Sequence, residues 1–461
     1  LSWVGGRSYY KDTEVLHFRM PSEPTQRFAP MVNIQQYYVE QFADEAAKRY
    51  GQYGNLADVR WGCKVQAVRQ IADGNEVDVV DTAGKNHTVR ADWLVACDGG
   101  RSTVREQLGL QLQGMQYDGK YVIVDIHQKT KRAVERLAWF DPPSNPGSTI
   151  LMHRQPEDVW RIDYQIRDDE DPLEVIKPEN VLPRVQSHLT MIGETEPWET
   201  LWISIYNAKC LSLEKYRHNR VLFAGDAAHL VPIFGVRGLN SGLDDASSLA
   251  WRLARVIQGT SPDSLLDSYS TERVHAAHEN MAYGAKSTEF MAPPNFAFKL
   301  MREATLRLAL DDEKVRSLIN PRQSTPIHYS GSALNVADVD SWSSDLAAPG
   351  MPMPDMQLDD GSHLSQQFGH RFVCMVLGGD LQASEADRLA QMGIKIVSIT
   401  DNKYAGYSHF GLSKDTEKAL ILVRPDGYVM GRWRGHDVEP VRLAMQRVIA
   451  NKLAKPTGET V

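Results

Sequence analysis

The chain has 461 residues, of which 42% are hydrophobic and 24% charged, and its formal net charge is -8. This length allows two or three domains with a large buried core. The negative charge argues against general nucleic-acid binding, and no apolar run is long enough to predict a transmembrane helix. The four cysteines, Cys63, Cys97, Cys210 and Cys374, form no C-x-x-C and no metal-ligand spacing. We therefore expect reduced thiols in a cytoplasmic protein without a metal site.

The first part of the chain predicts strands around one helix. Residues 1–30 have the pattern of short strands and turns. Residues 33–50 carry apolar side chains at helical spacing, with Asn33 as the expected N-cap. Alternating apolar residues from 61 to 96 predict a hairpin or meander that leads into a buried strand, with Cys97 as a small buried hydrophobe.

The rest of the chain predicts a strand-rich middle, a helical segment and a small α/β unit. Within residues 116–207, the stretch "VWRIDYQIR" alternates apolar and polar side chains, which predicts a sheet with one packed and one polar face. Residues 346–361 are rich in Pro and Gly and predict a linker, and a hairpin turning at 425–427 follows. After "RVLFAGDAAH", a long helix is predicted whose apolar stripe is Leu243, Ala246, Ala250, Leu253 and Ile257.

Two segments share one pattern: a buried strand, then a turn that contains an aspartate, which we call an acidic turn, and then a helix. They are "VACDGGRSTVR" and "FAGDAAHLVPIFGVRGLNSG". An acid at such a strand end often accepts a hydrogen bond from a sugar hydroxyl, and the glycines let the backbone approach a cofactor. The helix start after the second turn suits a phosphate or a reduced flavin. Alternatively, Asp98 and Gly99 form an ordinary turn, or Asp226 and His229 form an acid–base pair.

Together, "CDGGRSTVR" and "AGDAAHLVPIFGVRGLNSGLDDASSLAWRLA" resemble the single-component FAD-dependent aromatic hydroxylases of the para-hydroxybenzoate hydroxylase type. The stretches "ADWLVACDGGRSTVREQLGL" and "YVIVDI" are most similar to the branch of 3-(3-hydroxyphenyl)propionate and phenol hydroxylases. The resemblance implies an α/β protein with an FAD-binding, Rossmann-like domain of the glutathione reductase type (31–115 and 208–335). It further implies a β-sheet substrate domain (1–30 and 116–207) and a thioredoxin-like C-terminal domain (346–461).

The same resemblance implies roles for individual residues. Asp226 matches the acid that binds the ribityl or ribose part of FAD, Asp98 matches an acid linked to FAD and NAD(P)H, and Pro232 matches a proline beside the flavin ring. No side chain is assigned a catalytic role, because the flavin performs the chemistry. From their place in the middle sheet, His153, Arg161 and Tyr164 are polar candidates for the substrate pocket. The expected cofactor-binding residues are Gln36, Asp98, Gly99, Arg105, Gly225, Asp226, Pro232, Gly235, Gly238, Leu239 and Asn240.

The activity implied is that of an enzyme of aromatic catabolism. NAD(P)H would reduce the flavin, O2 would form a flavin C4a-hydroperoxide, and that species would hydroxylate a small phenol. The expected partners are this phenol and O2, with no nucleic acid and no membrane. The C-terminal domain lacks C-x-x-C, so we expect a structural role for it or a homodimer contact.

One departure from the family is the absence of the G-x-G-x-x-G turn, which would stand before Leu1. We therefore expect a member that is incomplete at its N-terminus and lacks the first βαβ unit. The alternatives are another flavoenzyme on the same scaffold (an epoxidase, halogenase or reductase) and a non-catalytic fragment that has lost FAD binding. The halogenase signature W-x-W-x-I-P is absent, which disfavours that member of the first group.

Overall fold

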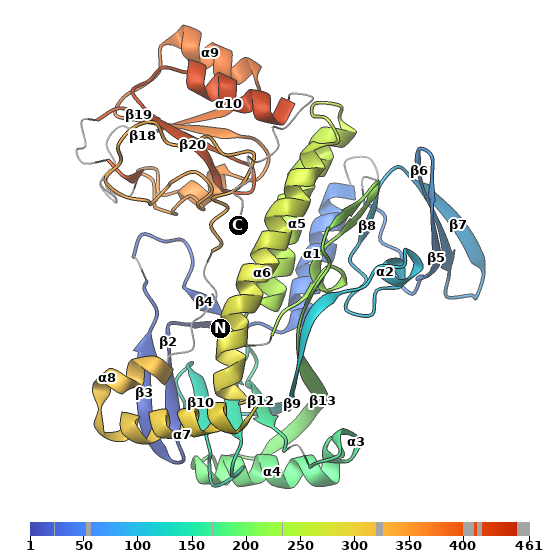
Figure 1. The fold of residues 1–461 in the computed structure, drawn as a ribbon, viewed down its shortest axis with the longest axis vertical. Coiled ribbons are helices and arrows are strands. Elements are labelled where there is room, and N and C mark those ends of the chain that lie inside the picture. Colours follow the sequence, from blue (N-terminus) through green and yellow to red (C-terminus); the bar gives the residue numbers. More distant parts are fainter. Residues whose placement is uncertain are drawn as a thin grey trace.

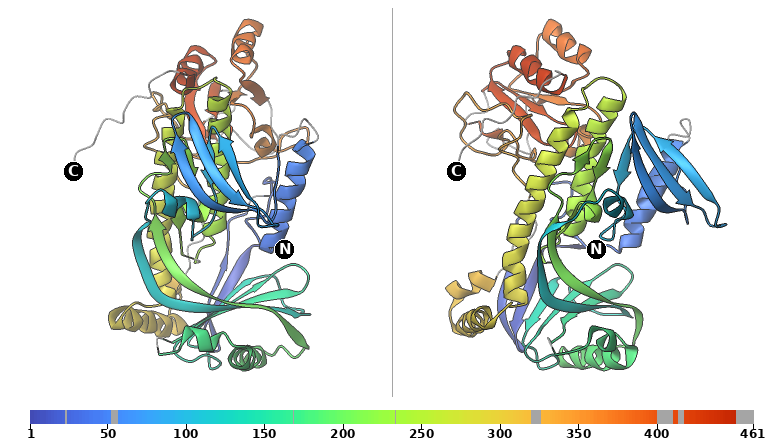
Figure 2. Two further views of the ribbon diagram at one scale, coloured as in Figure 1. Left: turned by 90° about the vertical axis from the view of Figure 1, so that its right-hand side faces the viewer. Right: turned by 45° about the vertical axis from the view of Figure 1, so that its right-hand side comes forward.

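Three parts of the molecule follow one another along the long axis of Figure 1. A broad sheet lies at the bottom, the long helices α5 (Gly238–Ile257) and α6 (Leu265–Met291) run through the middle, and a small α/β unit lies at the top. Figure 2 shows the same order from two other sides. The computed structural model describes residues 1–22, 24–51, 57–167, 169–232, 234–319, 326–399, 410–412 and 417–449.

The broad sheet has eight strands within the described ranges, in the order β16-β13-β9-β12-β11-β10-β2-β3. Neighbouring strands pair antiparallel except β10 and β2, which run parallel. This parallel pair joins the start of the chain to the strand-rich middle segment in one sheet. The strands are β2 (Gly5–Tyr10), β3 (Thr13–Arg19), β9 (Gln113–Gln128), β10 (Arg136–Phe140), β11 (Thr149–Arg154), β12 (Val159–Gln165), β13 (Trp198–Ser212) and β16 (His229–Leu230).

Strand β12 explains why the broad sheet has two different faces. Trp160 and Tyr164 are buried on one face, where they join the core formed with α4 (Pro178–Met191). Arg161 and Asp163 line a cavity on the other face, since successive side chains of a strand point to opposite sides. The predicted packed and polar faces are confirmed, and burial extends to Asp163 on the polar face.

Further helices pack against this sheet. The short α3 (Pro172–Val175) precedes α4 on the packed face. The helix α7 (Phe296–Asp311) packs against β3, and its buried apolar residues Leu306 and Ala309 belong to a core shared with the sheet. It is followed by α8 (Glu313–Arg316) and η2 (Ser317–Ile319), so the predicted helical segment extends to residue 319.

Two short strands bring the acidic turns together. Strand β8 (Leu94–Ala96) pairs in parallel with β15 (Val221–Phe223), which is fully buried as predicted. The prediction for β8 is wrong in part, because Val95 and Cys97 are exposed. Both line a wide cavity, so the alternation of the strand turns them away from the core.

The helix expected from residue 33 begins later, as α1 (Gln36–Gly51). Asn33 is therefore not its N-cap. Its Oδ1 accepts a hydrogen bond from Trp3 Nε1 at 2.9 Å, and its amide donates to the carbonyl of Arg154 at 2.8 Å. The other small elements of this region are β1 (Ser2–Trp3), β4 (Met31–Val32), β5 (Lys64–Ile71), β6 (Gly74–Val80), β7 (Asn86–Ala91), α2 (Thr103–Gln107), β14 (Arg217–His218) and η1 (Gly225–Ala227).

The apolar stripe predicted on α5 faces a cavity instead of the core. Leu243 is 51% exposed and Ile257 is 63% exposed. The opposite side of the helix is buried and carries charged residues, among them Asp245 and Arg252. Ion pairs to α6 and to the C-terminal unit determine which side of α5 is inside.

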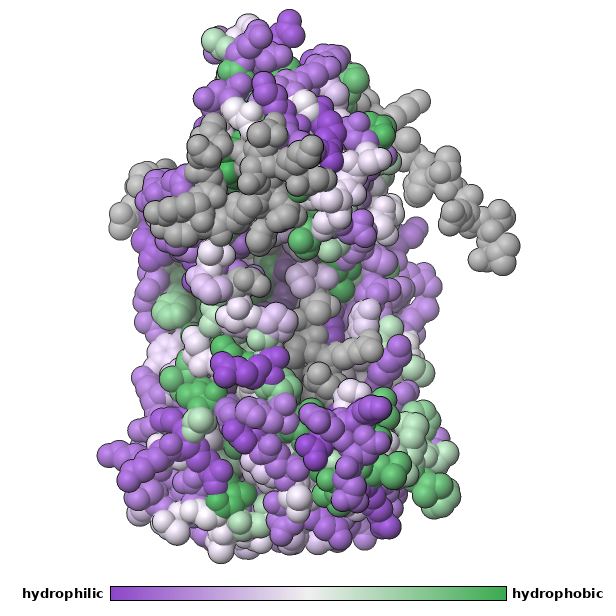
Figure 3. Space-filling model, turned by 90° about the vertical axis from the view of Figure 1, so that its left-hand side faces the viewer, coloured by the Kyte–Doolittle hydropathy of each residue, from purple (hydrophilic) through white to green (hydrophobic). Residues whose placement is uncertain are grey.

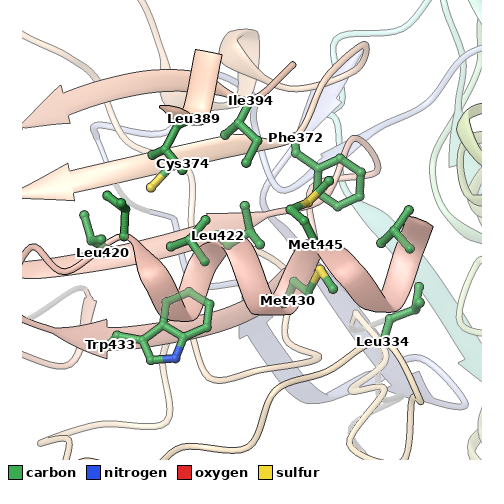
Figure 4. Packing of buried hydrophobic residues seen from close by; sticks show 14 of the residues in the cluster. Leu334, Phe372, Cys374, Leu389, Ile394, Leu420, Leu422, Met430, Trp433 and Met445 are labelled. Atoms are coloured by element: carbon green, nitrogen blue, oxygen red, sulfur yellow. The ribbon is translucent and has the colours of Figure 1, made fainter. Parts of the chain in front are cut away.

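The C-terminal unit is built on the sheet β18-β17-β19-β20, and two helices pack on the same face of it. Figure 4 shows its core, in which Cys374, Leu422 and Met445 pack together. The predicted hairpin at 425–427 is confirmed, because the N–H of Arg424 donates to the carbonyl of Tyr428 at 2.8 Å. The elements are η3 (Leu364–Gln367), β17 (Val373–Leu377), α9 (Ala383–Gln391), β18 (Lys395–Ile399), β19 (Ala419–Val423), β20 (Val429–Arg434) and α10 (Glu439–Ile449).

The Pro- and Gly-rich segment 346–361 is not a free linker. Met353 and Met356 are buried in the second core of the C-terminal unit. The N–H of Met353 also donates to the carbonyl of Gly427 in the hairpin at 2.8 Å. Burial of its methionines therefore holds this segment on the unit that it precedes.

The surface seen in Figure 3 is mostly hydrophilic, with hydrophobic residues in scattered patches. Single exposed apolar side chains are normal on folded proteins. Among the helices that the structure describes, none combines the length and hydropathy needed to cross a membrane.

Candidate functional site

The side chain of Arg105 joins the two acidic turns at the ends of β8 and β15. Its Nη2 donates to the carbonyl of Gly100 at 2.6 Å, and its Nη1 donates to the carbonyl of Ala227 at 2.9 Å. The first acceptor belongs to one turn and the second to the other. Arg105 therefore contacts the backbone of both turns and fixes their spacing.

Asp98 directs its carboxylate toward its own helix. Oδ1 accepts from the hydroxyl of Ser102 at 2.5 Å, and Oδ2 accepts from the N–H of Val104 at 3.0 Å. The second bond pairs a backbone N–H in the first turn of α2, where a carboxylate is favourable. The neighbouring Gly99 lines the wide cavity with a φ of 79°, whereas Arg101 is exposed.

The wide cavity has a volume of about 920 Å³ and lies between β8, β15, α1 and the apolar side of α5. It brings together several residues that the sequence predicted for cofactor binding. The predicted residues that line it are Gln36, Gly99, Gly225, Asp226, Pro232, Gly238 and Leu239. Gly235 lines a second, smaller cavity, and the amide of Asn240 donates to the carbonyl of Val236 at 2.7 Å.

Asp226 is an acceptor without a donor among the described residues. Its carboxylate is open to the wide cavity, whose walls limit its access to bulk water. This burial raises the pKa of Asp226, while nearby His229 opposes the rise. A carboxylate in this position gains from hydroxyl donors of a ligand, because hydrogen bonds compensate lost hydration.

The N-terminus of α5 also reaches the wide cavity. Arg237 is the N-cap residue, and its side chain makes no capping bond. The helix then starts at Gly238 and Leu239, which both line the cavity. Free N–H groups and the positive end of the helix dipole favour a negatively charged group here.

A buried carboxylate that the sequence interpretation missed, Asp245, holds the second turn in place. Its Oδ2 accepts from the N–H of Gly225 at 2.8 Å and hydrogen-bonds His229 Nε2 at 2.7 Å, and its Oδ1 accepts from Arg273 Nε at 2.5 Å. Burial alone would raise the pKa of Asp245, but the bonds to His229 and Arg273 outweigh it and lower that pKa. His229 therefore pairs with Asp245 and not with Asp226.

Arg273 extends this arrangement from α6. Its Nη1 donates to the hydroxyl of Tyr329 at 2.5 Å, and its Nη2 donates to the carbonyl of Ser241 at 3.0 Å. Both Arg273 and Asp245 are at most 1% exposed. The acidic turn, the start of α5 and the middle of α6 thus share one buried polar network.

A second buried cluster attaches the C-terminal hairpin to α5 and α6. The guanidinium of Arg424 donates to both oxygens of Glu272, at 2.7 and 2.9 Å, and to Asp426 at 2.8 Å. Arg252 donates to Glu272 at 2.6 Å and to Asp426 at 3.3 Å. Two guanidinium groups and two carboxylates balance their charges here, with each side chain at most 2% exposed.

The smaller cavity has a volume of about 270 Å³ and lies on the polar face of the broad sheet. Of the predicted substrate residues, His153 and Arg161 line it. Tyr164 does not, because it lies three positions after Arg161 on β12 and its side chain therefore points to the packed face. There Arg184 lies over its ring, 5.6 Å from the centroid.

The two cavities share a wall. Arg161 and Tyr206 line both of them. Arg161 donates to the two oxygens of Asp125 at 2.9 and 2.8 Å, and the Tyr206 hydroxyl donates to the carbonyl of Val231 at 3.2 Å. These bonds hold the shared wall between the sheet and the loop that follows the second turn.

Burial sets the charges of the smaller cavity. It lowers the pKa of His153 to about 3, with help from Arg136 and Arg161, so the imidazole is neutral at pH 7. It raises the pKa of Asp163 to about 7 and lowers the pKa of Arg136 to about 10, which leaves that guanidinium charged. Arg136 and Asp163 were not predicted, although the parity of β12 places Asp163 beside Arg161 on the same face.

Replacing Asp245 by alanine should lower the free energy of unfolding by about 3–5 kcal/mol, because Arg273 would stay buried without its partner. The control is Asp387→Ala, at an exposed acid on the helix α9 (Ala383–Gln391). It should change stability by less than about 0.5 kcal/mol. Urea denaturation measures both, and equal losses would contradict the role assigned to Asp245.

Asp163→Asn should stabilise the protein near neutral pH. The pKa of Asp163 is raised to about 7 in the folded state, so the folded chain holds this proton more tightly than the unfolded chain. Its stabilising effect is present at low pH and is lost as the pH rises from about 4 to about 7. Thermal unfolding should show a gain for the variant at about pH 8 that shrinks toward about pH 4. Asp169→Asn, at an exposed acid, is the control, and a gain independent of pH would contradict the assignment.

Known proteins resemble this chain in sequence. The FAD binding domain family matches residues 15–283, which is more than half of the chain. A 3-(3-hydroxy-phenyl)propionate/3-hydroxycinnamic acid hydroxylase of Klebsiella pneumoniae (strain 342) is 32% identical over 427 residues, or 86% of this chain and 74% of that protein. A similarly named hydroxylase of Burkholderia vietnamiensis (strain G4 / LMG 22486) is 27% identical over 270 residues, or 59% of this chain and 43% of that one.

Solved structures share the fold. The flavin-dependent monooxygenase PieE, in complex with FAD and substrate, gives a TM-score of 0.77 at 20% identity and covers 97% of this chain and 87% of its own. The OxyS anhydrotetracycline hydroxylase from Streptomyces rimosus gives 0.63 at 27% identity and covers 90% and 80%. The α/β architecture is that of FAD-binding hydroxylases, and the chain belongs to the FAD binding domain family.

Proposed function

We propose that the protein uses FAD, NAD(P)H and O2 to hydroxylate a phenolic ring. One observation carries this proposal: two cavities meet at a wall formed by Arg161 and Tyr206. The wide cavity is lined by the acidic turns and is large enough for a long cofactor. The smaller cavity lies on the polar face of the broad sheet and suits a single aromatic ring. A cofactor and a substrate in these positions would meet at the loop 232–238.

The donor and acceptor groups of the wide cavity fit FAD. Asp226 would accept hydrogen bonds from ribose or ribityl hydroxyls. Gly99 and Gly225 have φ values of 79° and 60°, and the space beside each Cα is open for a close approach. Asp98 and Arg105 would affect FAD binding indirectly, because their hydrogen bonds fix the conformation of the two turns.

The loop after the second turn fits the flavin ring. Pro232 would pack beside the ring, with Gly235 on the substrate side and Gln36 at the opposite edge of the cavity. The first N–H groups of α5, at Gly238 and Leu239, would stabilise negative charge on the ring, worth up to roughly 2 kcal/mol. Asn240 would keep these N–H groups in position through the hydrogen bond from its amide to the carbonyl of Val236.

FAD, when bound, supplies the redox chemistry that transfers one oxygen atom from O2 to the ring. The chain itself positions the substrate and excludes water. Leu151, Phe234 and Ile123 provide apolar contacts in the smaller cavity, and His153 stays neutral beside them. A closed, partly apolar site protects reactive species from water.

We also propose the domain organisation that the resemblance implied. The parallel pair β17–β18, the antiparallel pairs to β19 and β20, and the flanking helices support a thioredoxin-like C-terminal unit. Burial raises the pKa of Cys374 to about 12, which favours a structural role over redox work. All four cysteines are free, which supports a reducing, cytoplasmic location. The proposed FAD-binding domain is 31–115 with 208–335, the proposed substrate domain is 1–30 with 116–207, and the C-terminal domain is 346–461. The contact of α7 with β3 favours assigning residues 296–316 to the substrate domain instead.

The direct test is turnover by the full-length protein. Purified protein loaded with FAD should show flavin absorbance and should oxidise NADH or NADPH faster when a suitable phenol is present. Chromatography should detect the phenol with one added hydroxyl group. Flavin-loaded protein that yields no hydroxylated product from a broad phenol set would overturn the proposal and favour another flavoenzyme activity.

The cofactor assignment has its own test. Asp226→Ala should weaken FAD binding by roughly 10–100-fold, the value of about 1.5–3 kcal/mol expected for a hydrogen bond to a charged group. Asp92→Ala, at an exposed acid just before β8, is the control and should bind FAD as the wild type does. Flavin fluorescence titration measures both affinities, and unchanged binding by Asp226→Ala would rule out the ribose contact.

A further inference from the structure

The smaller cavity contains a buried acid with an acceptor that the protein leaves open. Asp163, on β12, is 5% exposed, and its Oδ1 has no hydrogen-bond partner among the residues that the structure describes. Asp245 and Glu272 are the other acids buried to this degree in the described ranges. Each of them accepts hydrogen bonds from at least one arginine. Asp163 therefore differs from both in having a buried oxygen without a donor.

Two arginines attract Asp163 electrostatically, but neither donates a hydrogen bond to its Oδ1. Burial raises the pKa of Asp163 to about 7; the positive charges of Arg161 and Arg136 oppose this rise, and the negative charge of Asp125 adds to it. Arg161 gives two of its hydrogen bonds to Asp125. Arg136 lies two strands away, on β10, and its Nη1 donates to no group in the described part of the chain. The charge of Asp163 is thus compensated, while its oxygen still lacks a donor.

A ligand can supply the donor that Asp163 lacks. A buried acceptor without a donor is costly, because its lost hydration is not replaced. Asp163 lines a cavity of about 270 Å³, so a small ligand can reach the carboxylate. The strand register places Leu151 and Ile123 on either side of Asp163, and both line the same cavity. A ligand that donates to Asp163 would therefore have apolar side chains beside that hydrogen bond, as an aromatic ring requires.

The position of Asp163 along the sheet places it near the loop 234–236. Phe234 packs edge-on against Tyr121 on β9, with 5.3 Å between the ring centroids. Tyr121 is two residues from Ile123, the register partner of Asp163, which corresponds to about 7 Å along the strand. Phe234 and Ile123 both line the smaller cavity. A ring held at Asp163 would therefore lie beside this loop, where the proposed cofactor and substrate meet.

A second open acceptor in the cavity lies farther from the loop. Gln155 lines the cavity, and its Oε1 has no hydrogen-bond partner within the described ranges. It follows β11 and is four residues from Leu151, which corresponds to about 13 Å of extended chain. Because β9 and β11 both pair antiparallel with β12, they run in the same direction, and Gln155 lies on the side away from Tyr121. Asp163 is therefore the acceptor nearer to the loop.

We propose that Asp163 accepts a hydrogen bond from a hydroxyl or amino group on the aromatic ring of the substrate, and so determines which edge of the ring faces the loop 234–236. The inference rests on the proposed function and adds a specificity-determining residue to it. The two carboxylates and two guanidinium groups of this region balance their charges when ionised, so a neutral donor completes the site without adding charge. A ring with an ether oxygen at this position brings no donor and leaves the carboxylate unsatisfied.

The test compares phenol, aniline and anisole, which differ only in the group attached to the ring. At about pH 8 the wild-type protein should bind phenol and aniline more tightly than anisole, with a ratio of roughly 10-fold for phenol. Asp163→Leu keeps the branched shape, removes the acceptor and should abolish this preference. Asp163→Asn retains an uncharged acceptor and should keep part of it. Asp169→Asn, at an exposed acid after β12, is the control and should keep the wild-type ratio.

The preference for phenol should also increase with pH, because a protonated carboxyl would donate to the ether oxygen of anisole. The raised pKa of Asp163, about 7, places this increase between about pH 6 and about pH 8, where phenol itself stays neutral. The pKa of His153 is lowered to about 3 and that of Arg136 to about 10, so neither changes its charge in this range. Arg161 and Tyr206 have raised pKa values and keep their protons.

Isothermal titration calorimetry on the FAD-loaded protein measures these affinities without turnover. Equal binding of phenol and anisole by the wild type, no binding of either, or an unchanged ratio in Asp163→Leu would overturn the role of Asp163. Asp163→Asn, which should be stable near neutral pH, should lose the pH dependence of the ratio, and its retention would contradict the assignment even if Asp163→Leu fails to fold.

Two further outcomes separate this inference from its alternatives. A preference that is lost in Gln155→Leu and retained in Asp163→Leu would assign the donor to Gln155 and overturn the proposal. Absence of hydroxylated product despite binding that depends on Asp163 would overturn the proposed function alone.

Discussion

The fold around the cofactor depends on one buried carboxylate, that of Asp245. A carboxylate with no access to water needs donors on its oxygens, and here these are Gly225, His229 and Arg273. Because they come from the acidic turn, from β16 and from α6, satisfying one group fixes three elements relative to α5. The buried carboxylate of Asp245 on α5 therefore fixes the conformation of the turn that carries Asp226.

The adjacent residue on α6 carries this constraint to the C-terminal unit. Glu272 binds Arg424 of the hairpin, and Arg273 binds Asp245 beneath the turn. One helix thus connects the cofactor loop to the last part of the chain through groups that are nearly inaccessible to solvent. Displacing the hairpin would leave Glu272 and Arg252 buried without full compensation, so the C-terminal unit stabilises the central helices.

Strand alternation and turn chemistry were sufficient to predict much of the fold and the acidic turns from the sequence. The same alternation, applied to the odd spacing between Arg161 and Tyr164, would have excluded Tyr164 from the cavity. The buried side of α5 could not be predicted, because the partners of its charges lie on α6 and on a hairpin far along the chain. For the same reason Asp245, within "GLDDASS", gave no signal that distinguished it from the exposed Asp244.

The central claim is that the paired turns hold FAD so that its ring meets the substrate at the loop between the two cavities. A crystal structure of the full-length protein with FAD and a phenolic substrate tests it most directly. The account predicts ribose or ribityl hydroxyls at Asp226, the flavin ring beside Pro232 and the start of α5, and the phenolic ring in the smaller cavity. A flavin bound elsewhere, or a phenol bound outside the smaller cavity, would contradict it.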